Sequence, residues 1–177
     1  MRHALKLHPT STCHQVSLIS VEVERTTFGG LVLHYVLSGD TSALLVPPKD
    51  KPERTDDLWH HTCFEVFIAR GQETAYREFN LSPSTRWAAY RFTSYREGMA
   101  NLDQTKTPAI EFSITPDAIE LKATVNPDLP GNEAWRLAVS AAIEEKSGHK
   151  SYWALSHPNQ RPDFHNADSF TISLPSP

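Results

Sequence analysis

The chain has 177 residues, of which 39% are hydrophobic and 21% are charged, and its formal net charge at pH 7 is −4. This length and composition predict one globular domain spanning residues 1–177. The acidic balance and the scatter of Lys and Arg exclude a nucleic-acid-binding protein, which needs basic residues clustered on one face. No apolar run approaches the roughly 20 residues that a membrane span requires.

The N-terminal segment and the cysteines bear on the cellular compartment. Residues 1–9 contain no apolar stretch long enough for a signal peptide. Cys13 and Cys63 could form one bridge, but two cysteines are too few for the disulfide framework of a secreted chain. We therefore expect a cytoplasmic protein with two free thiols.

Short runs of β-branched and aromatic residues alternate with turn clusters along the whole chain. This pattern is typical of an all-β sandwich or barrel. A charged, proline-rich loop is expected at residues 47–54. The predicted strands are 19–24, 31–37, 63–69, 75–81, 86–93, 109–114, 119–125, 152–155 and 169–174.

Residues 133–146 are compatible with either a strand or a helix. The segment has high helix propensity. Its apolar residues nevertheless fall on alternate positions, which is the period of a strand, although helical spacing also accommodates several of them. Because the neighbouring segments are strands, we favour a strand here and keep a helix as the alternative.

Polar and aromatic side chains share one face of the hairpin predicted for residues 75–81 and 86–93. A four-residue loop, 82–85, would pair Leu81 with Arg86. A one-residue slip of this register would change the faces. With the register as stated, one face carries Tyr76, Glu78, Asn80, Trp87 and Arg91. Rings, a carboxylate, an amide and a guanidinium together suit a polyhydroxylated or otherwise polar ligand.

Glu65 lies in an otherwise apolar predicted strand. It shares a face with Cys63 and Phe67, and a carboxylate there is costly to bury without a partner. One interpretation is a structural ion pair with Arg91 or Arg77. The other is that Glu65 faces a cavity and binds a ligand.

Several of these motifs resemble the DOMON-like superfamily and, within it, are similar to the family 9 carbohydrate-binding modules. The resemblance covers residues 16–174 and implies an antiparallel β-sandwich of jelly-roll type with a ligand cleft. The motifs that carry it are Asp57-Leu58-Trp59, Cys63-Phe64-Glu65-Val66-Phe67, Tyr76-Arg77-Glu78-Phe79-Asn80-Leu81-Ser82-Pro83, Tyr152-Trp153-Ala154-Leu155-Ser156-His157-Pro158 and Pro162-Asp163-Phe164-His165.

The resemblance also implies roles for particular side chains. In the family 9 modules two Trp side chains clamp a terminal sugar, while polar groups bind its hydroxyls. Trp59 and Glu65 match one Trp and its nearby Glu, and Trp153 is the candidate for the second clamp. Arg91 or Arg86 would supply the guanidinium, and the predicted hairpin favours Arg91. Without an export signal, a cytoplasmic sugar, sugar nucleotide or other small polar metabolite fits better than a polysaccharide.

Two alternatives involve a bound metal or cofactor. Other DOMON domains hold haem between a Met and a His, so the resemblance also implies Met99 with His157 or His165 as a possible haem pair. His157 is in addition a candidate ligand-binding residue. Zinc is a further alternative, although the tight paired spacing of zinc ligands is missing. Its candidate ligands are His60, His61, Cys63, His157 and His165.

The leading hypothesis is a non-catalytic domain that binds a small sugar-like molecule without a cofactor. Residues 95–98 would be a loop at the mouth of the cleft, or only a solvated turn. One alternative is a protein-interaction module whose cleft accepts a partner chain. Another is a glycoside hydrolase that uses Glu65 and Glu78 as paired acids. The candidate ligand-binding residues are Trp59, Glu65, Glu78, Asn80, Trp87, Arg91, Trp153 and His157.

Overall fold

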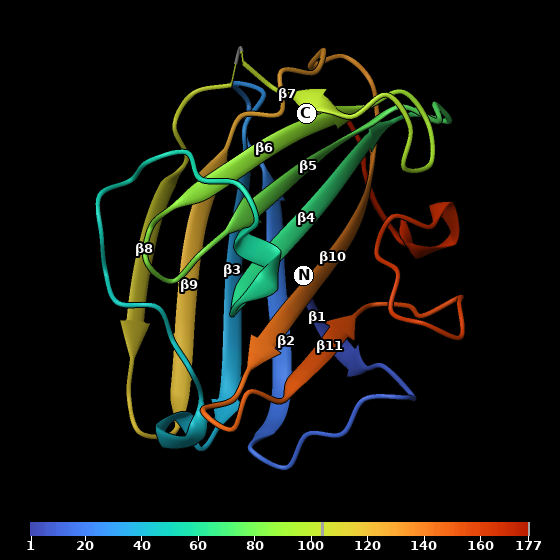
Figure 1. The fold of residues 1–177 in the computed structure, drawn as a ribbon. Coiled ribbons are helices and arrows are strands. Elements are labelled where there is room, and N and C mark those ends of the chain that lie inside the picture. The colour runs from blue at the N-terminus through green and yellow to red at the C-terminus, as the bar shows by residue number, and fades with distance from the viewer. Residues whose placement is uncertain (104, 177) are drawn as a thin grey trace.

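The computed structural model describes residues 1–103 and 105–176, and β-strands dominate it. Neighbouring strands pair antiparallel and form two layers (Figure 1). Layer A contains β1 (Arg2–Leu7), β2 (Val16–Arg25), β3 (Leu31–Gly39), β8 (Ala109–Ile114) and β9 (Ala118–Val125). Layer B contains β4 (Cys63–Arg70), β5 (Tyr76–Leu81), β6 (Trp87–Phe92), β7 (Ala100–Asn101), β10 (Trp135–Glu144), β11 (Lys150–Ala154) and β12 (Ile172–Leu174). The predicted all-β sandwich is confirmed.

The main core lies between the two layers. In β3, Leu33 and Tyr35 are fully buried, and Phe64 and Phe79 of layer B are fully buried as well. Tyr35 also donates its hydroxyl proton to the backbone oxygen of Glu65, 2.7 Å away, which links the layers through a satisfied polar group. Period-two alternation in the strands therefore produces one continuous apolar interior.

Strand β1 joins the two layers and was missed in the sequence. Residues Arg2 to Leu5 pair with β2, and Lys6 and Leu7 pair with β11. One strand thus hydrogen-bonds to layer A with its first half and to layer B with its second. This arrangement curls the twelve strands into one connected sheet.

Residues 133–146 contain strand β10, as favoured from the sequence. Trp135, Leu137 and Ile143 are fully buried on its inner face. The alternate residues Ser140 and Ala142 project from the other face of layer B. Pairing with β4 on one side and β11 on the other outweighs the helix propensity of the alanines.

The outer face of layer B is also covered, and this cover creates the site described below. Phe67 and Tyr76 are almost completely buried there, and Phe164 and Phe170 of the C-terminal loop pack against the same cluster. Figure 1 shows the C-terminal segment after β11 beside β10, and a short helix lying over β4 and β5.

The helices among the described residues are three single 3-10 turns. They are η1 (Thr41–Ala43), η2 (Leu58–His60) and η3 (Ala167–Ser169). None of them has the length and apolar character needed to cross a membrane.

Candidate ligand-binding site

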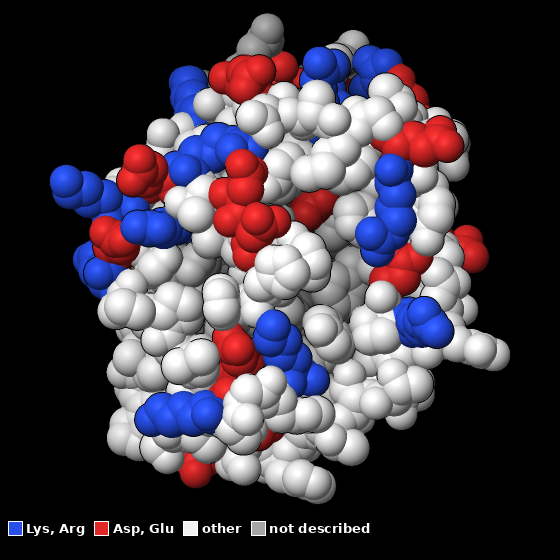
Figure 2. All heavy atoms as spheres, in the orientation of Figure 1, with Lys and Arg blue, Asp and Glu red and all other residues white. Residues whose placement is uncertain are grey.

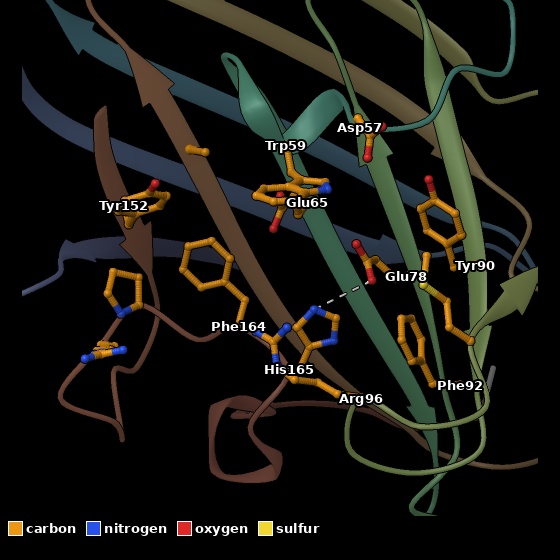
Figure 3. A pocket seen from close by; sticks show the side chains of 14 residues that line it. Asp57, Trp59, Glu65, Glu78, Tyr90, Phe92, Arg96, Tyr152, Phe164 and His165 are labelled. Carbon is orange, nitrogen blue, oxygen red and sulfur yellow. Dashed lines mark ion pairs between the residues drawn. The ribbon is translucent and has the colours of Figure 1, made fainter. Parts of the chain in front are cut away.

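A cavity of about 690 Å³ opens on the outer face of layer B. Its floor is formed by β4, β5, β6 and β10, and its walls come from the η2 segment, the loop after β6 and the C-terminal loop (Figure 3). Figure 2 shows an acidic group at the bottom of a hollow on this face, surrounded mainly by uncharged surface. The lining residues are Asp57, Trp59, Glu65, Glu78, Tyr90, Phe92, Arg96, Met99, Ala142, Tyr152, Arg161, Pro162, Phe164 and His165.

Two buried carboxyl groups form the polar part of the floor. Glu65 on β4 pairs with Asn80 on β5, so Glu78, two residues away from Asn80, projects from the same face. The side-chain hydroxyl of Ser140 donates to Glu65 Oε2 at 3.1 Å, and Asn80 Nδ2 donates to Glu78 Oε1 at 3.0 Å. Each carboxyl group therefore accepts one hydrogen bond, Glu65 from the neighbouring strand β10 and Glu78 from its own strand β5.

Burial moves the titration of both carboxyl groups towards neutral pH. It raises the pKa of Glu65 to about 8, and the negative charge of Glu78 contributes further. Burial likewise raises the pKa of Glu78 to about 7. The hydrogen bonds from Ser140 and Asn80 and the charge of Arg96 act in the opposite direction. The floor consequently holds protons at neutral pH.

His165 borders the floor as a neutral imidazole. Its Nε2 lies 3.9 Å from Glu78 Oε2, and its Nδ1 lies 2.8 Å from the hydroxyl oxygen of Tyr76. Burial lowers the pKa of His165 to about 4, and the charge of Arg96 adds to this effect. His165 therefore supplies no positive charge to Glu78 at neutral pH.

Aromatic rings make up most of the walls. Trp59 lies in η2 with 48% of its surface exposed, and its ring stacks on that of His60 at a centroid distance of 3.7 Å. Tyr90 is fixed by a hydrogen bond from its hydroxyl to Asp56 Oδ1, and Phe92 stacks on Tyr76 with ring centroids 4.7 Å apart. Tyr152 and Phe164 close the opposite side (Figure 3). These rings offer flat apolar surfaces to a ligand.

Asp163 holds two of the wall-forming loops together. Its carboxylate accepts hydrogen bonds from Arg96 Nη2 at 3.0 Å and from the Tyr95 hydroxyl at 2.6 Å. Asn159 Nδ2 donates to the same carboxylate at 2.8 Å. Asp163 thus balances the charge of Arg96 and ties the loop after β6 to the C-terminal loop. Residues 95–98 were expected to be either a loop at the mouth of the cleft or a solvated turn. The structure favours the first alternative, because Arg96 lines the cavity.

The structure brings together part of the predicted set of site residues. Trp59, Glu65 and Glu78 line the cavity, and Asn80 lies behind Glu78 as its hydrogen-bond donor. Asn80 is itself fully buried, and its Oδ1 has no hydrogen-bond partner among the described residues. That these four residues bind a ligand stays a prediction.

The predicted register of the hairpin formed by β5 and β6 is wrong by one residue. Leu81 pairs with Trp87 and not with Arg86, because Thr85 adopts a left-handed conformation with φ of 73° and the loop accommodates one more residue. Trp87 therefore lies in the core between the layers, and Arg91 is exposed on the face opposite Glu78. The same shift places Tyr90 and Phe92 at the cavity instead.

Trp153 and His157 also lie away from the cavity. Trp153 pairs with Ala141 of β10 and is buried in the main core, where its Nε1 donates to Ser151 Oγ at 3.0 Å. Its neighbour Tyr152 takes the cavity-facing position. His157 Nε2 lies 2.7 Å from the backbone oxygen of Lys6, so His157 fastens the C-terminal loop to β1.

The structural ion pair considered for Glu65 is wrong as well. Arg77 and Arg91 face each other across β5 and β6 on the side of the sheet opposite Glu65. The partner that Glu65 has is the hydroxyl of Ser140. Its second carboxyl oxygen accepts no hydrogen bond from the described residues.

The cavity does not fit haem held between Met99 and a histidine. His157 is outside it, and His165 directs Nε2 towards Glu78 while its Nδ1 is bound to Tyr76. Nδ1 of His165 is therefore occupied, and an iron atom at Nε2 would meet Glu78 on that side of the ring. The zinc alternative has no support either, because the described residues contain no cluster of three or more His, Cys, Asp or Glu side chains suited to a metal ion. His61 instead pairs with Glu144 at 2.7 Å.

No protein-family model matches this chain, and a search of curated proteins finds no match. Solved structures do resemble it. A Bacteroides uniformis protein that is provisionally described as carbohydrate-binding superposes with a TM-score of 0.69 at 15% identity, over 96% of this chain and 84% of that chain.

A family 9 carbohydrate-binding module from Caldicellulosiruptor kristjanssonii is similar in two complexes. The cellotriose complex superposes with a TM-score of 0.58 at 8% identity, over 97% of this chain and 80% of that chain. The glucose complex gives 0.56 at 8% identity, over 97% and 83%. At such low identities the likeness shows the fold, and the fold is similar to that of the family 9 modules.

Proposed function

We propose that this chain binds a small sugar-like molecule in the cavity on layer B and catalyses no reaction. The observation that carries the proposal is the pairing of an exposed indole with two buried carboxyl groups in one cavity of about 690 Å³. Sugar rings present apolar C–H faces that pack on aromatic rings, and their hydroxyls donate to carboxyl oxygens. The fold of structural neighbours that bind glucose and cellotriose supports the same interpretation.

The two carboxyl groups give little support to glycoside hydrolysis. Acid–base catalysis by a carboxyl pair needs environments that separate the two pKa values, so that one group is charged while the other is protonated. Here the same buried setting raises both pKa values, to about 8 and about 7. Two carboxyl groups that both hold protons near neutral pH suit hydrogen bonding to a ligand better than nucleophilic attack. A separate and narrower proposal is that the chain belongs to the DOMON-like superfamily.

Replacing Trp59 with alanine is expected to weaken sugar binding at least about tenfold, because the ligand loses its most accessible stacking surface. The affinity would be measured by calorimetry with glucose and cellotriose. Trp59 packs mainly on His60 and is half exposed, so the melting temperature of the variant should stay near that of the unmodified protein.

The matched control is Phe28→Ala, which removes another exposed ring, 95% accessible, far from the cavity lining. It should leave the affinity unchanged. Fluorescence gives an independent readout, because Trp87, Trp135 and Trp153 are buried and Trp59 is not. A sugar-induced change in emission that persists in the Trp59→Phe variant would contradict the placement of the ligand.

A further inference from the structure

The floor of the cavity contains two carboxyl groups and no counter-ion. Among the described residues no Lys or Arg lies within ion-pair distance of Glu65 or Glu78. His165 lies 3.9 Å from Glu78 but is neutral near pH 7. Arg96 and Arg161 also line the cavity, and the guanidinium of Arg96 is paired with Asp163 and acts on the two carboxyl groups only from a distance. A buried carboxylate without a cation is costly, so the missing charge has to come from protons or from a ligand.

Each carboxyl group keeps one oxygen that accepts no hydrogen bond from the described residues. Ser140 occupies Glu65 Oε2, and Asn80 occupies Glu78 Oε1. The remaining oxygens, Glu65 Oε1 and Glu78 Oε2, accept no hydrogen bond from the described residues, although the two side chains are only 3% and 6% exposed. Figure 3 shows both carboxyl groups on the cavity side of β4 and β5. Two free acceptors on adjacent strands suit a single group that has several donors.

The walls favour a cation at the same place. Ring faces attract positive charge, and the attraction is strongest where water is excluded. Tyr90 and Phe92 rise from β6 beside Glu78, and Trp59 lies on the other side of the floor (Figure 3). An ammonium group provides three donors and one positive charge in a compact volume, and it therefore satisfies the acids and the rings together.

We propose that the ligand is an amino sugar, a sugar whose ring carries a protonated amine, and that its ammonium group sits between Glu65 and Glu78. This inference rests on the proposed function, because it takes the ligand to be sugar-like. Hydroxyl groups of a neutral sugar would also reach these oxygens, but they bring no positive charge to favour the ionised form of the two carboxyl groups. The amine is the feature that distinguishes the preferred ligand from its neutral analogues.

The test compares D-glucosamine, D-glucose and N-acetyl-D-glucosamine by calorimetry with the full chain at pH 7. The three sugars share one ring and differ at one substituent, which is charged only in glucosamine. We expect glucosamine to bind at least about tenfold more tightly than either neutral sugar, since one pKa unit of charge interaction corresponds to a factor of ten.

Glutamine variants assign this preference to the floor. Glu65→Gln and Glu78→Gln keep the shape of the side chain and remove its charge, so each should reduce the advantage of glucosamine over glucose at least about fivefold. Glu24→Gln removes an exposed carboxylate on layer A and should leave the advantage intact. Thermal melting of each variant shows that it is folded.

Proton release gives a second readout that needs no variant. A bound ammonium favours the ionised carboxyl groups, so glucosamine binding at neutral pH should release protons, and its enthalpy should differ between phosphate and Tris buffers. Glucose should show no such difference. The titratable and charged groups that face Glu65 and Glu78 from the surrounding elements are Asp57, Cys63, Tyr90, Arg96, Tyr152, Arg161 and His165.

The failure of this inference can be told apart from the failure of the proposed function. If glucose binds as tightly as glucosamine, or if glucosamine binds without releasing protons, the amine inference is overturned while sugar binding stands. If none of the three sugars binds, both proposals are overturned for this class of ligand. A preference for glucosamine that survives in both glutamine variants would also overturn the inference.

Discussion

Raising the pH from 6.5 to about 8.5 is expected to lower the free energy of unfolding by about 3 kcal/mol. The cause is the buried pair on the cavity floor, whose pKa values are about 8 for Glu65 and about 7 for Glu78, against 4.5 for an unperturbed Glu. In this range the native state binds more protons than the unfolded chain, so each increment of pH favours unfolding. Urea denaturation at the two pH values measures the difference.

The sign of the effect follows from the direction of each shift. A carboxyl group with a raised pKa contributes stability that is present at low pH and is lost as the pH rises through its folded-state pKa. His165 acts in the opposite sense, because its pKa of about 4 in the native state is below the ordinary 6.5, and only about 0.4 kcal/mol of its contribution changes above pH 6.5. The two glutamates therefore dominate the interval from pH 6.5 upward.

A double variant, Glu65→Gln with Glu78→Gln, should make the stability nearly independent of pH over this interval. The matched control replaces two exposed glutamates of layer A, Glu24 and Glu111, with glutamine and should retain the full decrease. A decrease of the same size in the double floor variant would show that other groups are responsible. Bound ligand would have to be absent from all samples, because it also shifts stability.

The second large effect is expected at Arg25, where alanine should lower the free energy of unfolding by about 3 kcal/mol. The guanidinium of Arg25 on β2 lies 3.7 Å from the ring centroid of Trp135, the first residue of β10, and so joins layer A to layer B. Its two terminal nitrogens also donate to four backbone oxygens, those of Pro130, Gly131, Glu133 and Pro175.

The estimate combines two modest contributions. A cation over an indole ring contributes about 1 kcal/mol at a partly exposed site. Four partly exposed hydrogen bonds add about 0.5 kcal/mol each, since water replaces much of what is lost. Arg25→Lys should recover little, because an ammonium group has no planar surface for the ring and cannot reach four carbonyl oxygens at once.

Arg2→Ala is the matched control for Arg25, and chemical denaturation of all variants provides the measurement. Arg2 lies on the neighbouring strand β1 and makes an exposed ion pair with Glu22 at 3.1 Å. Exposed pairs of this kind contribute about 0.2–1 kcal/mol. Comparable losses for Arg2→Ala and Arg25→Ala would show that Arg25 does not fasten the two layers.

The fold could be predicted from the sequence because local patterns determine most of its strands. In the hairpin of β8 and β9, β9 alternates buried and exposed residues, and the chain turns through Thr115-Pro116-Asp117, as expected. In β10 the alternation of Trp135, Leu137 and Val139 was the correct signal, and pairing on both sides overcame the competing helix propensity. Strand β1 was missed because its weak alternation carries little apolar weight.

Apart from Trp59, which the family resemblance indicated, the candidate site could be predicted only where the alternation within one strand was sufficient. The directions of the Glu65 and Glu78 side chains could be predicted because β4 and β5 were both assigned correctly and side chains alternate along a strand. The pairing of the two strands places both side chains on one face. Trp87 and Arg91 were placed on that face only through an assumed loop length. Nothing in Ser82-Pro83-Ser84-Thr85 indicated that Thr85, which is not a glycine, would adopt a left-handed conformation and shift the register by one residue.

The walls of the cavity depend on contacts between distant loops. Arg96 and Asp163 are 67 positions apart in the chain, and their ion pair has no counterpart in any local pattern. Phe164 and His165 lie in an irregular segment, and periodicity says nothing about the direction of side chains there. The motif Pro162-Asp163-Phe164-His165 was a signal through family resemblance alone.

The floor of the cavity lies on regular strands, whereas part of its walls comes from irregular loops. The acids stand on paired strands whose spacing is set by backbone hydrogen bonds, whereas Phe164, His165 and Arg161 come from an irregular segment that is held by side-chain contacts, those of Asp163 among them. Substitutions in that segment can therefore reshape the opening while the paired strands below it stay in place. Proteins that share these strands should accordingly differ in the shape of this opening sooner than in their architecture.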